Sequence, residues 1–523
     1  MKIVLTCDET LTGTYRDIPL LDFLPCAPSE KVPSFIYSIL NTQLEHKNGV
    51  LEVAPYSLRK VEASLLKQLS KSDVTVAHPS HVQKFVDDRT DIVGISTMDP
   101  LGLGPVTMMF TFGGLLTSYS KKKFTELVKT LNDMRIKRGY RYKIVVGGSG
   151  SWQLALTGNW KELGIDHIVV GETDHIINEI FDQIVQGNAP KVIYVKSFPK
   201  VEEISTIVNP SYKGMVEVMR GCGRNCKFCE PNLRTVRFIS TERILDEVTV
   251  NLKHGIAHGW LHSEDIFLYK LKDFRNFYPN SEEVVGLFRS VMGMKGMEYV
   301  NPTHGSIAPV VAEPSMVENI SKVVGANAER WVGIQVGMET ASPSLMKKYM
   351  ANKVKPFSPE EWPKIVIEGT YILNKNFWFP AYTLMIGLPG ESNDDALETA
   401  GLILAMEKFL RERLDSRAHF TVTPLAFIPL GVLKNESFFN ISEAITEERF
   451  LLIYTAWKHI AKEIDSSLPI ILKNNPVGKI IFPLIAKFGI RTLLRAIRSW
   501  GIERGYDPDK PIKPSEDAIM IRR

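Results

Sequence analysis

The segment Arg220-Gly221-Cys222-Gly223-Arg224-Asn225-Cys226-Lys227-Phe228-Cys229 decides how the rest of the chain is interpreted. It follows Met215–Met219, an apolar run that predicts a buried strand. The spacing Cys-x3-Cys-x2-Cys puts three thiols on one loop, around a single centre. The other two cysteines, Cys7 and Cys26, lie near the start of the chain. Five cysteines are too few for a disulfide framework. We therefore expect a metal site in a cytoplasmic protein.

Two kinds of metal centre compete for this loop. A structural zinc ion needs a fourth ligand, and His254 and His258 are candidates, although they follow a predicted helix at no familiar zinc spacing. A cubane iron–sulfur cluster has four irons, so three thiolates leave one iron open to a substrate or cofactor. An open position is typical of a catalytic metal site. We therefore favour a 4Fe-4S cluster over zinc.

From the cysteine region onward, strand and helix patterns alternate over residues 205–435. Six βα units are too few for a full eight-unit barrel, so the pattern predicts a partial, open-sided (β/α)6 barrel. The expected strands are Met215–Met219, Asp265–Tyr269, Glu298–Val300, Trp331–Val336, Trp378–Ile386 and His419–Phe427. The expected helices between them include Thr241–Leu252, Ser358–Leu373 and Asp394–Phe409.

Residues 1–200 alternate in the same way and predict a doubly wound, Rossmann-like α/β domain. Ligands of such folds bind at the carboxyl ends of the strands. Glycine-bearing segments follow three strands there, at 98–104, 147–150 and 171–173. Ordinary strand-to-helix turns also need glycine, so spacing alone favours turns. The expected strands are Lys2–Thr6, Asp73–Ala77, Asp91–Ser96, Tyr142–Gly147 and His167–Gly171.

Residues 436–523 predict a helical C-terminal region that contains a basic, apolar segment, 476–500. Lys487, Arg491, Arg495 and Arg498 share one helical face there. The segment is either a core-packing helix with a solvated basic face or an interfacial helix on anionic lipid. No apolar run reaches the roughly 18 residues needed to span a bilayer. The net charge of +4 is too small to indicate nucleic-acid binding.

The cysteine loop resembles that of the radical S-adenosylmethionine (SAM) superfamily, in which Cys-x3-Cys-x-aromatic-Cys ends the first barrel strand. By that resemblance Cys222, Cys226 and Cys229 ligate a 4Fe-4S cluster, and its open iron chelates the amino and carboxylate groups of SAM. An electron from the cluster then cleaves the sulfonium and releases a 5′-deoxyadenosyl radical. The resemblance implies a reducing partner of the ferredoxin or flavodoxin type.

The same resemblance assigns SAM-binding roles to residues outside the cysteines. Phe228 matches the position that lies against the adenine, and Glu264 stands where the superfamily has an acidic turn that binds the amino group. The usual Gly-Gly-Glu of that turn is replaced by His262-Ser263-Glu264. Two later segments, Gly333–Thr340 and Met385–Glu391, resemble cofactor-contacting elements. They add Gln335, Glu339 and Gly387 to the expected SAM contacts.

A doubly wound domain ahead of such a barrel resembles the cobalamin-binding class of radical SAM enzymes. Ile144–Gly148 and Gly164–Thr173 look like two of its loop signatures. The Asp-x-His-x-x-Gly motif that supplies a histidine ligand in many cobalamin proteins is missing, and Met98–Gly102 stands in its place. The cobalamin contacts implied by the resemblance are Asp99, Gly102, Gly147, Gly148, Gly171 and Glu172.

The sequence and the resemblance leave three candidate functions. The first is C–C bond formation on a lipid chain, as in the archaeal relatives that form cyclopentane rings in tetraether lipids, with segment 476–500 at the inner face of the cell membrane. The second is cobalamin-dependent C-methylation. The third is an iron–sulfur or zinc binding module without catalysis. Tyr269, Tyr382 and Cys26 could relay a radical, but no residue is assigned a catalytic role.

Overall fold

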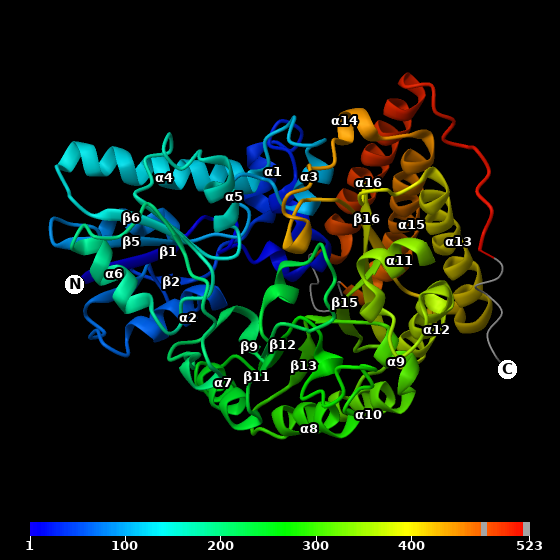
Figure 1. The fold of residues 1–523 in the computed structure, drawn as a ribbon, viewed down its shortest axis with the longest axis horizontal. Helices are drawn as coiled ribbons and strands as arrows, with labels where there is room; N and C mark the ends of the chain where they lie inside the picture. The colour runs from blue at the N-terminus through cyan, green and yellow to red at the C-terminus, as the bar shows by residue number, and fades with distance from the viewer. Residues whose placement is uncertain (472–477, 516–523) are drawn as a thin grey trace. The chain divides into compact units, whose positions relative to one another are not determined.

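The computed structural model describes residues 1–471 and 478–515, so the first two residues of segment 476–500 lie outside the described residues. The chain divides into two compact units. The first consists of Met1–Val216 and Glu242–His258, and the second of Glu217–Thr241 and Gly259–Arg523. Both contain parallel β-sheet with helices, and no sheet in the described residues closes into a barrel (Figure 1). The predicted α/β class is confirmed.

The first unit is built on a six-stranded parallel sheet ordered β4-β1-β5-β6-β7-β8. Its inner strands are Ile- and Val-rich because helices cover both faces of the sheet. The five predicted strands are confirmed, and a sixth, β8, was not predicted. The strands are β1 (Lys2–Cys7), β4 (Val74–Val76), β5 (Thr90–Ser96), β6 (Lys143–Gly147), β7 (His167–Val170) and β8 (Val192–Tyr194), and a separate hairpin pairs β2 (His46–Lys47) with β3 (Val50–Leu51).

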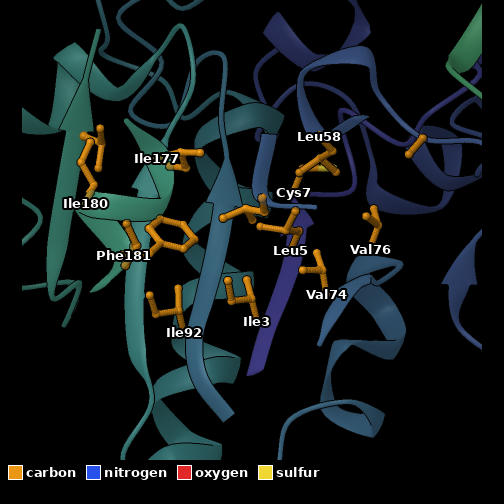
Figure 2. Packing of buried hydrophobic residues seen from close by; sticks show 14 of the residues in the cluster. Ile3, Leu5, Cys7, Leu58, Val74, Val76, Ile92, Ile177, Ile180 and Phe181 are labelled. Carbon is orange, nitrogen blue, oxygen red and sulfur yellow. The ribbon is translucent and has the colours of Figure 1, made fainter. Parts of the chain in front are cut away.

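Two apolar layers hold this sheet between its helices. On one face, Ile3, Leu5 and Cys7 pack against α2 and α6, and Figure 2 shows them on the same side as Phe181. On the other face, Val4 packs against α4 and α5. The side chains of successive β1 residues thus pack into the apolar layers on opposite faces of the sheet, as strand geometry requires. The helices are α1 (Ser34–Leu40), α2 (Tyr56–Leu65), α3 (Pro105–Phe110), α4 (Tyr119–Arg138), α5 (Ser151–Thr157) and α6 (Ile177–Val185).

Helix α7 (Thr241–Lys253) completes the first unit although it comes after the cysteine loop in the chain. Its Glu247 carboxylate is 5% exposed. It accepts hydrogen bonds from Tyr56 Oη at 2.7 Å, from Lys60 Nζ at 3.0 Å and from the Ile207 amide at 3.1 Å. The carboxylate therefore joins α7 to α2 and to the end of the preceding segment.

The second unit carries the antiparallel pair β10-β11 and two larger sheets, ordered β13-β12-β9 and β14-β15-β16-β17, of which β9 begins in the first unit. Thr303 connects them, because its amide donates to Leu261 and its carbonyl accepts from Gln335. In the described residues this gives an open arc of six strand positions, as predicted. The strands are β9 (Met215–Glu217), β10 (Met219–Arg220), β11 (Arg237–Phe238), β12 (His258–His262), β13 (Tyr299–Pro302), β14 (His304–Gly305), β15 (Val332–Glu339), β16 (Trp378–Ile386) and β17 (Thr421–Ala426).

One predicted strand is wrong. Residues Asp265–Tyr269 form a turn around a short 3-10 helix, Ile266–Leu268, and the second strand of the arc is β12. The apolar run Ile266–Leu268 is fully buried, which gives it the composition of a strand. The helices of the arc are α8 (Ser281–Met292), α9 (Ala308–Ala312), α10 (Pro314–Val324), α11 (Pro343–Tyr349), α12 (Trp362–Lys375) and α13 (Asn393–Leu414).

The C-terminal region is helical, as predicted, with α14 (Ile441–Ala444), α15 (Glu447–Ile471) and α16 (Gly478–Glu503). In α16, Ile490 and Ile497 are buried, and the Trp500 ring lies 6.1 Å from that of Phe450. Among the described basic residues of its outer face, Arg491 and Arg495 are exposed, and Arg498 pairs with Asp509. Among the described residues, no helix is both long and apolar enough to cross a membrane.

Candidate active site

The three cysteines lie on the loop that follows β10. Gly221 and Gly223 adopt positive φ values of 73° and 72°, a conformation that suits glycine. A Cβ on Gly221 would lie 2.8 Å from the Arg234 carbonyl oxygen. Cys222 and Cys226 are buried, and Cys229 is half-buried. Burial raises the pKa of the Cys222 and Cys226 thiols, so binding iron there must release protons.

Two neighbouring segments hold the loop in place. The Lys227 amide donates to the Tyr349 carbonyl at 2.9 Å, and the Lys227 carbonyl accepts from the Val432 amide at 2.7 Å. Gly431, with φ +60°, makes this contact possible, because a Cβ there would lie 2.7 Å from the Lys227 oxygen and 2.9 Å from the Cys229 nitrogen. The backbone between the second and third cysteines is therefore fixed from both sides.

Arg224, between the first two cysteines, ties the loop to the strand ends of the arc. Its side chain is 3% exposed, and its Nε donates to Asp265 Oδ2 at 3.1 Å. Nη2 donates to Ser306 Oγ at 2.8 Å, and Nη1 to the carbonyls of Asn352 and Lys353 at 2.8 and 3.1 Å. One buried guanidinium thus connects the loop with three other segments.

Glu264 lies beside the first cysteine. The Gly221 amide donates to its carboxylate, and Arg234 Nη1 lies 3.6 Å from Oε1. The other oxygen, Oε2, is buried without a hydrogen-bond partner, as is the neighbouring Ser263 Oγ. A buried carboxylate oxygen without a partner suits a cationic donor such as the amino group expected from SAM. The donor set of this loop fits the cluster and SAM.

The β15 segment contributes an ion pair and an exposed amide. Glu339 Oε1 accepts from Lys353 Nζ at 2.6 Å, and the Lys353 ammonium acts electrostatically on the Cys226 thiol. Gly337 leaves room for this pair, since a Cβ there would lie 2.1 Å from Glu339 Oε1. Gln335 is exposed on the same strand. Glu339 therefore meets the cysteine loop through Lys353.

Gly387 begins a tight turn at the end of β16. Its φ is +86°, its amide donates to Glu391 Oε2 at 2.9 Å, and a Cβ would lie 2.1 Å from the Phe439 ring. The turn reaches the cysteine loop through Tyr349, whose hydroxyl donates to the Pro389 carbonyl at 2.5 Å.

The structure thus brings Glu264 to the cysteine loop directly, and Glu339 and Gly387 through intermediates. Phe228 is half-buried on the loop itself.

Of the two tyrosines considered as radical relays, Tyr269 donates to the Ile239 carbonyl at 2.7 Å and Tyr382 lies 2.7 Å from Thr370 Oγ1. Both hydroxyl groups are therefore occupied by structural hydrogen bonds.

Sequence reasoning missed Arg224, Asp265 and Lys353. For Arg224 a signal was present, because a cation inside a loop of buried cysteines needs a buried partner. Asp265 and Lys353 carried no such signal, since only the folded arc brings their segments together.

Asp99, expected at a cobalamin site, is fully occupied in the first unit. Its Oδ1 accepts from the Gly104 amide at 2.9 Å and from Gln153 Nε2 at 2.7 Å. Its Oδ2 accepts from Thr107 Oγ1 at 2.5 Å and from Ser120 Oγ at 3.5 Å. Asp99 holds the loop after β5 and is not a free ligand.

The expected glycines mark close approaches of backbone at the same end of the sheet. Gly148 (φ +96°) lies against Thr97, whose carbonyl oxygen would be 2.5 Å from an added Cβ, and Gly171 (φ +120°) lies as closely against Val195. Gly102 (φ +72°) would meet Ser118 Oγ at 2.9 Å. These glycines therefore fit loop packing. Gly147 is half-buried at the end of β6 and has ordinary backbone, and Glu172 is half-buried in the turn after β7.

Two features at this end of the sheet remain available to a ligand. Thr97 Oγ1 is buried without a hydrogen-bond partner, and the Met98 side chain is 58% exposed. The hydroxyl fits a hydrogen bond to one of the amide groups that border a corrin ring, and the thioether fits contact with the ring, so these two residues would contact cobalamin bound at this edge.

Comparison with known proteins gives the family of the part of the chain that contains the cysteine loop. Residues 216–403 match the Radical SAM superfamily, so the chain carries a radical SAM domain. The tRNA-2-methylthio-N(6)-dimethylallyladenosine synthase of Alteromonas mediterranea is 23% identical over 276 residues, 50% of this chain and 53% of that protein. The enzyme of the same name from Hydrogenovibrio crunogenus is 24% identical over 224 residues, 40% of this chain and 42% of that protein. The chain thus spans about half the length of the curated relatives it matches.

One solved structure shares the fold at low sequence identity, and a second gives a lower score. The radical SAM methyltransferase TsrM from Kitasatospora setae, solved with tryptophan and a SAM analogue, superposes with a TM-score of 0.53 at 13% identity, covering 83% of this chain and 75% of that one. The cobalamin-dependent SAM radical enzyme OxsB gives a TM-score of 0.49 at 12% identity, covering 99% of this chain and 82% of that one.

Proposed function

We propose that this chain, which carries a radical SAM domain, reductively cleaves SAM and takes a hydrogen atom from an unactivated carbon of its substrate. The observation that supports this most directly is the pairing of a buried three-cysteine loop with Glu264, whose Oε2 has no partner. The match of residues 216–403 to the Radical SAM superfamily favours this function over a zinc-stabilised or electron-carrying module.

The residues would divide the work as follows. Cys222, Cys226 and Cys229 would hold the cluster, and Glu264 would accept hydrogen bonds from the amino group of SAM. Bound there, the cluster supplies one electron to the sulfonium of SAM, which yields methionine and the 5′-deoxyadenosyl group that accepts the hydrogen atom. The buried Lys353 ammonium, paired with Glu339, would offset the negative charge of the thiolates. A ferredoxin- or flavodoxin-type protein would deliver the electron.

The test is the yield of 5′-deoxyadenosine from protein reconstituted with iron and sulfide without oxygen and reduced with dithionite. We expect Cys226→Ala to lower the yield by about 100-fold or more, because its thiolate is a cluster ligand. Cys26→Ala, outside the loop, should leave the yield unchanged. An undiminished yield in Cys226→Ala would remove the cluster assignment, and no yield from the wild-type protein would favour a binding module.

For the substrate, we propose the alkyl chain of a membrane lipid, on which C–C bond formation would close a ring. Support comes from α16, where Phe488 is 73% exposed beside the exposed Arg491 and Arg495. An apolar side chain flanked by cations suits an anionic membrane surface.

Co-sedimentation with anionic liposomes tests this surface. Phe488→Ser combined with Arg491→Glu and Arg495→Glu should reduce pelleting by about tenfold, whereas Arg411→Glu, an exposed arginine of α13, should not. Equal pelleting of wild type and triple variant would sink the membrane part of the proposal.

A second candidate is transfer of a methyl group with cobalamin in the first unit. It is favoured by the free Thr97 hydroxyl and exposed Met98 at the carboxyl end of the sheet, and by the methyl- and methylthio-transferring relatives. Protein reconstituted with hydroxocobalamin and desalted would retain about one cobalamin per chain. A label carried on the methyl group of SAM separates the candidates, because methylation transfers it to the product and ring closure does not.

A further inference from the structure

Outside the candidate active site, the side chains of three histidines lie close together at the edge of the first unit's sheet. His46 lies on β2, His78 follows the edge strand β4, and His81 lies in the 3-10 helix Pro79–Lys84. One ring nitrogen from each lies within 4.8 Å of the other two. The ring centroids of His46 and His81 are 4.2 Å apart, and those of His46 and His78 are 5.0 Å apart.

The backbone brings these rings together. The hairpin turn uses Asn48 and Gly49 at positive φ, which is the pattern of a tight two-residue turn. The Gly49 carbonyl accepts from the His78 amide at 2.8 Å, which docks the turn on the residues after β4. A Cβ on Gly49 would lie 2.7 Å from His81 Cβ, so only glycine admits His81 at this distance.

The hydroxyl of Ser80 orients two of the rings. Ser80 Oγ lies 2.7 Å from His78 Nδ1 and 2.9 Å from His81 Nδ1, and the Ser80 amide donates to His78 Nδ1 at 3.3 Å. A metal ion bound by both Nε2 atoms would require both Nδ1–H groups to donate to this oxygen. On His78 the proton would then move from Nε2 to Nδ1, and the longer bond from the Ser80 amide would be lost. A hydrogen bond from the far nitrogen is how proteins usually orient a metal-binding histidine.

The nitrogen that remains on His78 is unsatisfied. His78 is 3% exposed, and its Nε2 is buried without a hydrogen-bond partner. His46 is exposed, and its Nδ1 accepts from the Gly49 amide at 3.2 Å, a long bond that metal binding through Nε2 would break. The cluster therefore has a buried, unpartnered nitrogen at its base and a movable ring at its solvent side.

We propose that His46, His78 and His81 bind one divalent transition-metal ion. Neutral imidazoles without carboxylate or thiolate suit zinc, copper and nickel. Tetrahedral zinc with Zn–N bonds of about 2.0–2.1 Å needs nitrogens about 3.4 Å apart, so the exposed His46 ring closes the set by turning inward. Three protein ligands leave the fourth position to water. The ion would clamp hairpin β2–β3 onto the edge of the sheet.

Zinc is the probe for this site. Full-length protein, loaded with its iron–sulfur cluster, would be dialysed against buffered free zinc, and both metals would be counted. Wild type should hold about one zinc more per chain than His46→Ala/His81→Ala, with equal iron in both. The double variant should bind zinc at this site about 100-fold or more weakly. His175→Ala, which removes a half-buried histidine elsewhere in the same unit, should match wild type.

Two further measurements guard against a misfolded variant. His46→Ala alone changes only an exposed ring and should still lower the affinity. Ser80→Ala keeps all three ligands and should weaken binding by about 10–100-fold, as loss of an orienting hydrogen bond does. Equal zinc in wild type and double variant, or wild-type binding only at millimolar zinc, would overturn the proposal. Neither count depends on SAM cleavage, so the result is independent of the proposed function.

Discussion

At Arg224, a guanidinium that is almost fully buried makes its hydrogen bonds to Asp265, to Ser306 and to two backbone carbonyls. Removing one partner of a buried ion pair leaves the other uncompensated, at a cost of about 3–5 kcal/mol. We therefore expect Arg224→Met to lower the free energy of unfolding in urea by about 3 kcal/mol and to reduce the iron retained after reconstitution.

A second change should restore part of this loss. In Arg224→Met/Asp265→Asn no charge stays buried alone, so the double variant should be more stable than Arg224→Met. Arg289→Met, on the exposed face of α8, serves as the control and should unfold like wild type. If the double variant were the less stable of the two, the ion pair would not be the source of the effect.

Glu264 should matter for SAM and not for the cluster. Hydrogen bonds to charged groups contribute about 1.5–3 kcal/mol, so Glu264→Gln should weaken SAM binding by about 10–100-fold. Iron content should stay at the wild-type level, because Glu264 is not a proposed ligand. Equilibrium binding of SAM to reconstituted protein measures the change, and Glu282→Gln, an exposed carboxylate of α8, is the matched control. Unchanged binding would remove Glu264 from the SAM site.

How far the site can be predicted differs from residue to residue. The cysteine spacing is local in sequence and can therefore be predicted from it. The same holds for the acidic turn that directly follows β12. The ion pair of Glu339 with Lys353 forms because the folded chain brings the segment after α11 back to β15. No local sequence pattern predicts this contact. Asp99 shows the opposite case. Its place after a strand suggested a ligand contact, but in the structure its carboxylate accepts hydrogen bonds from its own loop and its neighbours.

Between elements, the contact of α13 with α15 contains a pH-sensitive pair. Glu407 Oε1 lies 2.6 Å from His459 Nδ1, and Lys462 donates to Oε2 at 2.8 Å. Burial alone would raise the pKa of Glu407, but the hydrogen bonds and charges of His459 and Lys462 outweigh it and lower the pKa to about 2. The pair therefore stabilises the fold above the unfolded-state pKa of 4.5 and loses this effect as the pH falls toward 2.

This sign gives a prediction for Glu407→Gln. The variant should be less stable than wild type by about 2 kcal/mol at pH 6, and the difference should shrink as the pH falls to 3.5. Urea unfolding at both pH values measures it. Glu412→Gln, exposed on the same helix, should show no such convergence. A difference that stays constant with pH would mean that packing and not charge is responsible.

Long elements were predictable and short ones were not. Strand β16 and helix α13 carry enough residues for a periodic pattern, and both were expected close to their observed bounds. The two-residue strands β2 and β3 carry no period at all. The prediction of a strand at Asp265–Tyr269 was wrong because a short buried turn and a buried strand have the same apolar composition.

On the scale of the whole molecule, the first unit is discontinuous in sequence, since α7 belongs to it. Glu247 of this helix accepts hydrogen bonds from Tyr56, Lys60 and the Ile207 amide of the same unit, and hydrogen bonds to charged groups contribute about 1.5–3 kcal/mol each. We expect a fragment of residues 1–216 to melt at a lower temperature than the same fragment joined by a short linker to 242–258. Calorimetry would measure the two transitions.

Replacing Glu247 by Ala in the joined fragment supplies the control, because it keeps the length and removes these hydrogen bonds. That variant should melt no higher than 1–216 alone. Identical melting of all three would show that α7 adds nothing to the unit. A pattern of helical residues cannot reveal this membership, because α7 has the same apolar periodicity whichever unit it joins.

The position of α7 also orders events during synthesis. Translation proceeds from the N-terminus, so Cys222, Cys226 and Cys229 leave the ribosome ahead of the helix that completes the first unit. The nascent thiols therefore appear in the cell while the first unit still lacks its last helix. The segments that fix the cysteine loop, at Tyr349 and Val432, are made later still, so insertion of iron and sulfide into the finished loop is a late step of maturation.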